Sequence, residues 1–210
     1  MIEAGAPGTT GGVRLRKQIA TRRAVEEAAW RLFTTKGYHQ TKIDEIVQEV
    51  GISQRSFFRY FDSKEAVLFG DWRRDHEELA RRIEKADPAL APLSAVRAAA
   101  MSTADLMDRD RLLVRTRSEL TKSSPTVGGY YRQIIQPAWE EAVASALASR
   151  LGVDPDVDPT PRAVAGAAAG MLNAAVSVWV AGGCADLLTD LAARSFDVLN
   201  PPVERPTGDR

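Results

Sequence analysis

The sequence is poor in the residues that build disulfides, metal centres and catalytic sites. It holds one cysteine, Cys184, and two histidines, His39 and His76, among 210 residues. A single cysteine excludes an intrachain disulfide and is typical of a reducing compartment. The histidines are not spaced as zinc ligands with each other or with the cysteine, and no glycine-rich phosphate loop or nucleophile elbow occurs. We therefore expect no metal, no cofactor and no enzymatic activity.

Long apolar runs are also scarce. One stretch, Ala163–Val180, approaches the length of a membrane span. Alanine and glycine dominate it and Asn173 lies at its centre, which favours a buried helix of a soluble protein over a membrane span. Residues 1–12 lack the basic start and apolar run of a signal peptide. We expect a cytoplasmic protein that does not enter a membrane.

The net charge is zero, but the charges are unevenly distributed. Residues 13–64 contain 11 basic and 6 acidic residues, so the remainder of the chain is negative. This division favours an N-terminal part that faces nucleic acid and a body that does not.

Almost every segment shows the 3.6-residue period of a helix, and no run of alternating β-branched residues is present. The sequence predicts an all-α protein of about nine helices. We expect a disordered N-terminal arm (1–12), a first helical domain (13–62), a larger second helical domain (63–199) and a disordered tail (200–210). The expected helices outside the central motif are Arg16–Lys36, Ser63–Asp87, Leu93–Met107, Arg111–Thr121, Pro125–Leu151 with a kink near Gln133 caused by Pro137, Thr160–Ala181 and Leu187–Leu199.

Residues 42–61 have the pattern of a helix-turn-helix. Ile43, Ile46, Val47 and Val50 form one apolar helix face, which Thr41 can cap. Gly51 permits a left-handed turn, and Ser53 can cap a second short helix. Three aromatic residues of this second helix are expected in the core, although exposed aromatics can also stack on single-stranded bases: Phe57, Phe58 and Phe61.

Residues 25–68 read VEEAAWRLFTTKGYHQTKIDEIVQEVGISQRSFFRYFDSKEAVL. This stretch resembles the DNA-binding head of the TetR family of bacterial repressors. The residues that match at the family's spacing are Ala29, Phe33, Gly37, Thr41, Ile46, Gly51, Ser53, Tyr60, Phe61 and Lys64. The resemblance implies a three-helix head, a helical C-terminal domain that binds a small molecule, and a homodimer built from the last two long helices.

The sequence departs from the family pattern at one position, and one segment resembles a particular subgroup of the family. The family usually has a tyrosine at the position of Phe58, whose hydroxyl commonly meets a phosphate, and phenylalanine cannot make that contact. The segment FFRYFDSKEAVLFGD also resembles a subgroup whose C-terminal domain is described as binding acyl-CoA-like ligands.

Within this motif the DNA contacts can be assigned by position. The groove and its walls are assigned to Gln54, Arg55, Ser56 and Arg59, and the phosphates to Thr41, Lys42, Tyr60 and Lys64. A flexible arm carrying Arg14, Arg16 and Lys17 is expected to reach the minor groove. The alternative for each charged residue is a solvated surface position.

Surplus apolar side chains in the middle of the chain predict a ligand cavity, although the same residues also suit an ordinary core. The candidates are Met101, Met107, Trp139, Met171 and Trp179, with Arg115, Arg117, Tyr130, Tyr131 and Asn173 as polar anchors. The dimer surface is assigned to Ala163–Val180 and Leu187–Leu199, with apolar area from Leu188, Leu191 and Phe196; the alternative is that the Ala/Gly-rich helix is the interior of a monomer.

The sequence therefore predicts a ligand-responsive homodimeric repressor that binds a palindromic DNA operator and is released by a small apolar or acyl-type effector. The alternative is a helical protein that binds a small molecule and has no DNA-binding activity.

Overall fold

The computed structural model describes residues 9–199, and every regular element in this range is a helix. The predicted all-α class is confirmed. The chain divides into two compact units, Met1–Gly70 and Asp71–Arg210. This boundary lies at Gly70, whereas the sequence places it between residues 62 and 63. The predicted tail 200–210 and residues 1–8 of the predicted arm lie outside the described residues.

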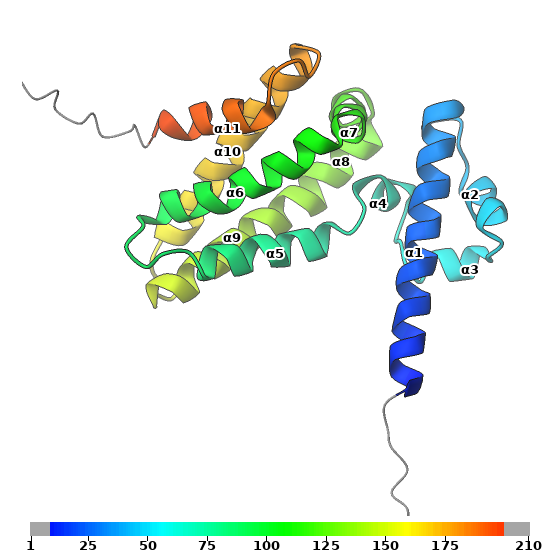
Figure 1. Cartoon of the computed structure of the whole chain (residues 1–210), viewed down its shortest axis with the longest axis horizontal. Coiled ribbons are helices and arrows are strands. Elements are labelled where there is room, and N and C mark those ends of the chain that lie inside the picture. Colours follow the sequence, from blue (N-terminus) through cyan, green and yellow to red (C-terminus); the bar gives the residue numbers. More distant parts are fainter. Residues whose placement is uncertain (1–8, 200–210) are drawn as a thin grey trace, which may run out of the picture. The chain divides into compact units, whose positions relative to one another are not determined.

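The first unit contains α1 (Thr9–Thr35), α2 (Ile43–Val50), α3 (Gln54–Phe57) and α4 (Lys64–Phe69) (Figure 1). α1 begins before the expected Arg16, so the predicted disorder is wrong for residues 9–12, which are helical. α2 and α4 pack on the C-terminal half of α1. The core of this unit is formed by Val25, Ala28, Ala29, Phe33, Ile46, Val47, Phe57 and Phe61.

The predicted helix-turn-helix is present in this unit. Gly51 ends α2 with φ 74° and ψ 35°, the left-handed conformation that glycine adopts without steric cost. Ser53 then caps α3, because its hydroxyl accepts the backbone N–H of Ser56 at 3.1 Å. α2 is not capped by Thr41; the carboxylate of Glu45 accepts the backbone N–H of Lys42 at 2.9 Å instead.

The second unit is a bundle of longer helices. It contains α5 (Trp72–Glu84), α6 (Pro92–Arg109), α7 (Arg111–Ser123), α8 (Pro125–Tyr130), α9 (Gln136–Leu151), α10 (Thr160–Ala181) and α11 (Leu188–Asp197). α9 packs between α5 and α10, and α6 packs against α5, α10 and α11. Leu79, Val96, Val143, Leu147 and Phe196 join these helices in one apolar core.

The structure interrupts two of the predicted long helices, Ser63–Asp87 and Pro125–Leu151. Ser63 caps α4 but does not open one long helix, because Gly70 takes φ 63° and ψ −145° and separates α4 from α5. The expected kink near Gln133 takes the form of a π-helical turn, Tyr131–Ile135. Pro137 has no backbone N–H to donate to the carbonyl four residues before it, and the helix is irregular at that position.

α10 is long and apolar enough, by length and composition, to cross a membrane. In the structure its buried side chains pack within the second unit, and they include Ala165, Ala168, Met171, Ala175 and Trp179. A core helix of a soluble protein passes the same test, so this single helix is weak evidence for a membrane span.

Candidate nucleic-acid and effector sites

The short helix α3 presents an exposed polar surface. Gln54, Arg55, Phe58 and Arg59 are all exposed. Phe58 caps the C-terminus of α3, and its N–H donates to the Gln54 carbonyl at 2.9 Å, so these two residues lie one turn apart; Arg59 follows in the turn after the helix. Two cations and an amide in this arrangement have the chemistry for guanine, adenine and phosphate contacts in a major groove.

The exposed side chains differ in how far they are already engaged. Gln54 donates to a carboxylate oxygen of Asp44. Arg59 lies over the ring of Tyr60 at 5.0 Å and donates to its hydroxyl at 3.2 Å. Arg55 makes no hydrogen bond or ion pair with any residue between 9 and 199. Its guanidinium is therefore the least restrained group on this surface.

The prediction that three phenylalanines form the core is wrong for Phe58. Phe57 and Phe61 are 0% and 2% exposed, but Phe58 is 50% exposed. Phe57 and Phe61 are four residues apart and point the same way, with ring centroids 5.6 Å apart. Phe58 is one residue further along the helix and is therefore rotated by about 100° toward solvent.

The assignment of Thr41 is also corrected by burial, whereas the groove contact assigned to Ser56 remains a prediction. Thr41 is 1% exposed, and its hydroxyl donates to the carbonyl of Gly37 at 2.9 Å, so its side chain cannot reach a phosphate. Ser56 is half-buried and its hydroxyl accepts from Ser53 at 3.1 Å. Both residues support the local turns of the motif. Lys42 is exposed and Tyr60 half-buried, and their phosphate contacts remain predictions.

Lys64 has a structural role that the sequence does not reveal. Its ammonium donates to the carbonyls of Tyr38 and Thr41 at 2.8 and 3.0 Å and lies 4.2 Å from the centre of the Tyr38 ring. Burial lowers the pKa of Lys64. Burial, with the adjacent charge of Glu65 that accepts the Tyr38 hydroxyl at 2.9 Å, raises the pKa of Tyr38. Lys64 thus fixes the α1–α2 connection, and only its third N–H is left for the predicted phosphate contact.

The predicted minor-groove arm is a helix in the structure. Arg14, Arg16 and Lys17 all lie in α1 and are exposed. Arg22, which sequence reasoning missed, anchors this helix: it donates to the carbonyls of Tyr60 and Gly70 at 3.3 and 2.9 Å. No local pattern distinguishes Arg22 from its basic neighbours, because its partners are distant in sequence.

In the second unit the predicted ligand residues fall into two apolar clusters. Met171 and Trp139 belong to the cluster of α5, α6, α9, α10 and α11. Met107 and Trp179 belong to a second cluster near the start of α11, and Met101 touches both. Trp179 is 1% exposed, and its indole N–H donates to the carbonyl of Asp186 at 3.0 Å.

The predicted polar anchors are likewise divided. Arg115 is exposed and pairs with Glu119 at 2.8 Å, so it faces away from the interior. Tyr131 donates to the Asn173 amide oxygen at 2.8 Å, and the Tyr130 hydroxyl is buried. Ligand contacts by these residues remain predictions.

Charged groups accompany this tyrosine-asparagine pair in the bundle. Burial lowers the pKa of Arg117, and the charges of Asp75, Asp110 and Tyr131 oppose that effect. Burial also raises the pKa of Asp75. Tyr131 and Asn173 therefore form a polar pair between the π-helical turn and α10, and the charges of Tyr131 and of the exposed Asp75 act on Arg117 of α7.

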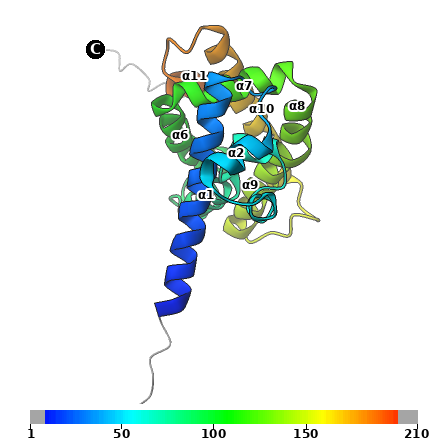
Figure 2. The ribbon, with the colours of Figure 1, turned by 90° about the vertical axis from the view of Figure 1, so that its right-hand side faces the viewer.

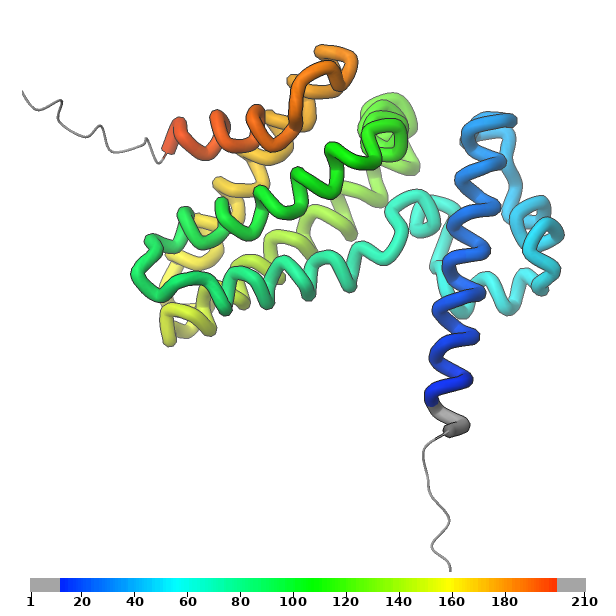
Figure 3. Tube along the Cα trace, viewed as in Figure 1, coloured from blue at the N-terminus to red at the C-terminus, as the bar shows by residue number. Residues whose placement is uncertain are grey.

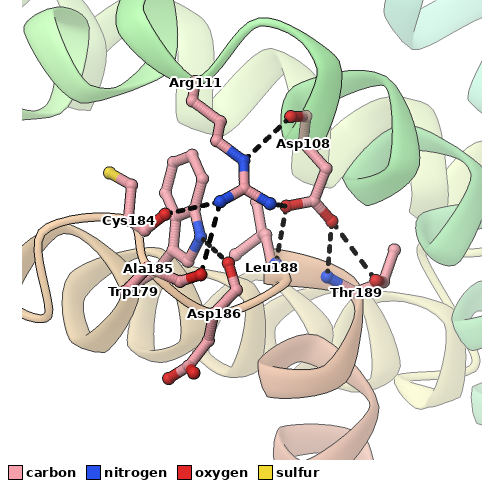
Figure 4. Close-up of polar contacts among 8 residues, drawn as sticks. All are labelled: Asp108, Arg111, Trp179, Cys184, Ala185, Asp186, Leu188 and Thr189. Carbon is pink, nitrogen blue, oxygen red and sulfur yellow. Dashed lines mark hydrogen bonds and ion pairs between the residues drawn. The ribbon is translucent and has the colours of Figure 1, made fainter.

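The connection between α10 and α11 is held by residues at the α6–α7 junction (Figure 4). The Asp108 carboxylate accepts the backbone N–H groups of Leu188 and Thr189 at 2.8 and 3.1 Å, and the Thr189 hydroxyl at 3.2 Å. Arg111 donates to the carbonyl of Cys184 at 2.6 Å. Asp108 thereby satisfies the first amides of α11, which has no cap of its own. We call Asp108 and Arg111 the α11 clasp.

The predicted source of apolar dimer area is wrong. Leu188, Leu191 and Phe196 are 2%, 8% and 0% exposed within one chain, so they cannot form a surface for a second copy. The exposed face of α10 is instead made of small and β-branched residues: Ala163, Gly166, Gly170, Ala174, Ser177, Val178 and Ala181.

The fold and the α3 surface together define a DNA-binding transcriptional regulator with a separate helical C-terminal domain. Two sequence profiles agree with this class. The profile described as bacterial regulatory proteins of the tetR family matches residues 27–69, and the MftR C-terminal domain matches residues 90–204. The chain belongs to the TetR family of bacterial transcriptional regulators. Among residues 9–199 no group of three or more His, Cys, Asp or Glu side chains is placed to hold a metal ion.

Named relatives match most of the chain. A Mycobacterium tuberculosis protein named as a mycofactocin biosynthesis transcriptional regulator, MftR, is 26% identical over 190 residues, covering 90% of this chain and 94% of the relative. The transcriptional regulator TcmR of Streptomyces glaucescens is 29% identical over 157 residues, covering 72% of this chain and 69% of TcmR.

Solved structures share the fold at low identity. The fatty acid degradation regulator FadR from Bacillus halodurans has a TM-score of 0.58 at 19% identity, with 88% of this chain and 97% of FadR covered. Thermus thermophilus FadR in complex with lauroyl-CoA has a TM-score of 0.55 at 20% identity, with 90% and 99% covered. SmeT in complex with triclosan also has a TM-score of 0.55 at 20% identity, with 90% and 100% covered.

Proposed function

We propose that this chain acts in the cytoplasm, without catalytic activity, as a homodimeric repressor of a palindromic operator. The single observation that carries the proposal is the exposed face of α3, where Arg55 makes no hydrogen bond or ion pair within the described residues. Arginine bidentate to guanine is the commonest specific base contact, and each such contact contributes roughly 1–3 kcal/mol of discrimination. One four-residue helix reads few base pairs, so useful specificity requires two heads on half-sites about 34 Å apart.

The exposed face of α10 is the surface that we propose for the dimer. Gly166, Gly170 and Ala174 recur along one side of the helix and are exposed. Small side chains let two helices approach closely, and Val178, at 60% exposure, adds apolar area beside them. Sedimentation equilibrium at micromolar concentration tests this surface: we expect a dimer for the native chain and a monomer for Gly170→Glu, which places a charge at the centre of the stripe.

The proposed effector is a small apolar or acyl compound bound in the second unit. Two FadR structures with this fold are in complex with lauroyl-CoA and stearoyl-CoA, which carry an apolar acyl chain, and SmeT is in complex with triclosan. In this chain Met101, Trp139 and Met171 supply adaptable apolar surface next to the polar pair of Tyr131 and Asn173. A ligand changes operator affinity only if it binds one conformation better than another. Gly70, which lies at the boundary of the two units and takes φ 63° and ψ −145°, is the position that we propose to carry this change.

The DNA-reading proposal is tested with an operator selected from random duplexes. Arg55→Ala should weaken binding to the selected operator by about 10- to 100-fold at fixed salt while helicity is unchanged, because only a base contact is removed. Arg31→Ala, which removes an exposed cation paired with Glu49 on the α1–α2 side of the head, is the matched control and should bind as the native chain does. If no operator emerges, or if Arg55→Ala binds it normally, the proposed reading face is wrong.

A further inference from the structure

The N-terminal half of α1 lies outside the core of the first unit. No residue between 12 and 24 is buried, and burial in the described part of the helix begins at Val25. Val13, Leu15 and Ile19 are 62%, 57% and 43% exposed. Figures 2 and 3 show this part of α1 continuing past α3 with no other helix of the first unit beside it. We call residues 12–24 the α1 extension.

The α1 extension is cationic and contains no acidic residue. Arg14, Arg16, Lys17 and Arg23 are exposed and make no ion pair within the described part of the chain. Cations near the N-terminus of a helix are unfavourable for its dipole, and the first turn of α1 has no acidic residue to compensate. These charges therefore do not stabilise the helix. A polyanion is the kind of partner that would make their positions favourable.

The α1 extension leaves the head beside the end of its reading surface. Arg22 holds α1 against the segment that follows α3, through its bond to the Tyr60 carbonyl at 3.3 Å. It also lies 4.6 Å above the ring of Phe61. Tyr60 directly follows Arg59, the last exposed cation of the α3 surface. The basic surface of α3 therefore continues into the basic helix.

The helical conformation decides which groove this segment fits. A helix with side chains is about 10–12 Å wide, whereas the minor groove is about 6 Å wide and the major groove about 12 Å. The cations also surround the helix: Arg14 and Arg16 are separated by about 200° around its axis. A cationic helix of this kind suits a major groove, where phosphates flank both sides.

We propose that the α1 extension binds duplex DNA in the major groove, at backbone phosphates beyond the base pairs that α3 reads. This inference rests on the proposed DNA-binding function and adds a second, sequence-independent contact to it. Thirteen helical residues span about 20 Å, which corresponds to roughly six base pairs at 3.4 Å per step. Each head of the regulator would therefore cover more DNA than its recognition helix alone.

The salt dependence of binding measures such contacts directly. The triple variant Arg14→Gln, Arg16→Gln, Lys17→Gln keeps good helix-forming residues and removes three charges. Binding to a random-sequence duplex of about 40 base pairs is measured by fluorescence anisotropy over a range of salt concentrations. The slope of log K against log salt should fall by about 2.7 per head if all three phosphate contacts are lost. The matched control, Arg109→Gln, Lys122→Gln, Arg194→Gln, removes three exposed charges from the second unit and should leave the slope unchanged.

The outcomes separate this inference from the proposed function. Loss of slope in the triple variant, with a hydroxyl-radical footprint on the selected operator about six base pairs shorter on each side, supports the inference. An unchanged slope overturns it, and if Arg55→Ala still loses operator binding the proposed function stands. If the triple variant retains DNA binding but loses binding to anionic phosphatidylglycerol vesicles, the extension is a membrane contact and the inference is wrong. The inference is also wrong if the triple variant changes only the self-association of the protein, measured by sedimentation, and binds DNA as the native chain does.

Discussion

Removal of the Asp108 carboxylate tests whether the α11 clasp stabilises the C-terminal domain. The Asp108 side chain is 9% exposed and accepts three hydrogen bonds, all from the first residues of α11. Asp108→Ala leaves the N–H of buried Leu188 and both donors of Thr189 without their acceptor. We therefore expect the variant to be less stable than the native chain.

The size of the effect follows from the three lost bonds. Loss of a helix cap costs about 0.5–2 kcal/mol, and a buried donor left without a partner costs about 1–3 kcal/mol. Water can reach Thr189, which is half-buried, so we count one buried donor and one cap. The expected loss of unfolding free energy is about 3 kcal/mol, or a fall in Tm of about 6–12 °C for a chain of this size.

Urea denaturation at one fixed protein concentration measures this loss, since dimerisation would couple stability to concentration. Asp105→Ala is the control: Asp105 lies one helical turn earlier on α6, its side chain is 55% exposed, and it pairs only with Arg109. Such an exposed pair contributes about 0–1 kcal/mol. If Asp108→Ala costs no more than Asp105→Ala, the clasp does not stabilise the domain and the reasoning fails.

Two further predictions concern stability of the head and dependence on pH. Lys64→Met keeps the length of the side chain but leaves the carbonyls of Tyr38 and Thr41 without their donor, so it should lower the free energy of unfolding by about 1–3 kcal/mol, as measured by thermal unfolding. Lys17→Met, at an exposed site, is the control and should cost almost nothing. Equal melting temperatures of the two variants would contradict the assigned role of Lys64. Burial lowers the pKa of His76 from 6.5 to about 4, so the unfolded chain binds this proton more tightly and stability should fall as pH drops from 6.5 toward 4. His76→Leu should remove that part of the pH dependence, and urea curves of the two proteins with parallel pH profiles would show that His76 does not titrate in this way.

Local pattern in the sequence was sufficient for much of the head. The spacing of Ile43, Ile46 and Val47, the glycine at 51 and the serine at 53 predict two helices and their turn, because helix faces, left-handed turns and caps depend on residues within about one helical turn. The prediction of Arg55 as an exposed cation rests on the same local geometry. Its contact with a base stays a prediction.

Errors arose where the environment of a residue depends on which side of a short helix meets the core. Phenylalanine is buried in most proteins, yet the ring of Phe58 is exposed. Threonine is exposed in most proteins, yet Thr41 is buried. A helix of four residues, such as α3, has too few positions for periodicity to define its inner face.

The sequence by itself determined the all-helical class, the position of the helix-turn-helix and the family, since each depends on patterns read along the chain. Only the tertiary structure decided how distant groups meet. Asp108 caps a helix that begins 80 residues later, and Lys64 binds carbonyls 26 and 23 residues before it. A charged residue is solvated when it has no partner nearby and holds two segments together when it does. The partners of Asp108 and Lys64 come from distant parts of the chain, so only the packed structure shows that they have any.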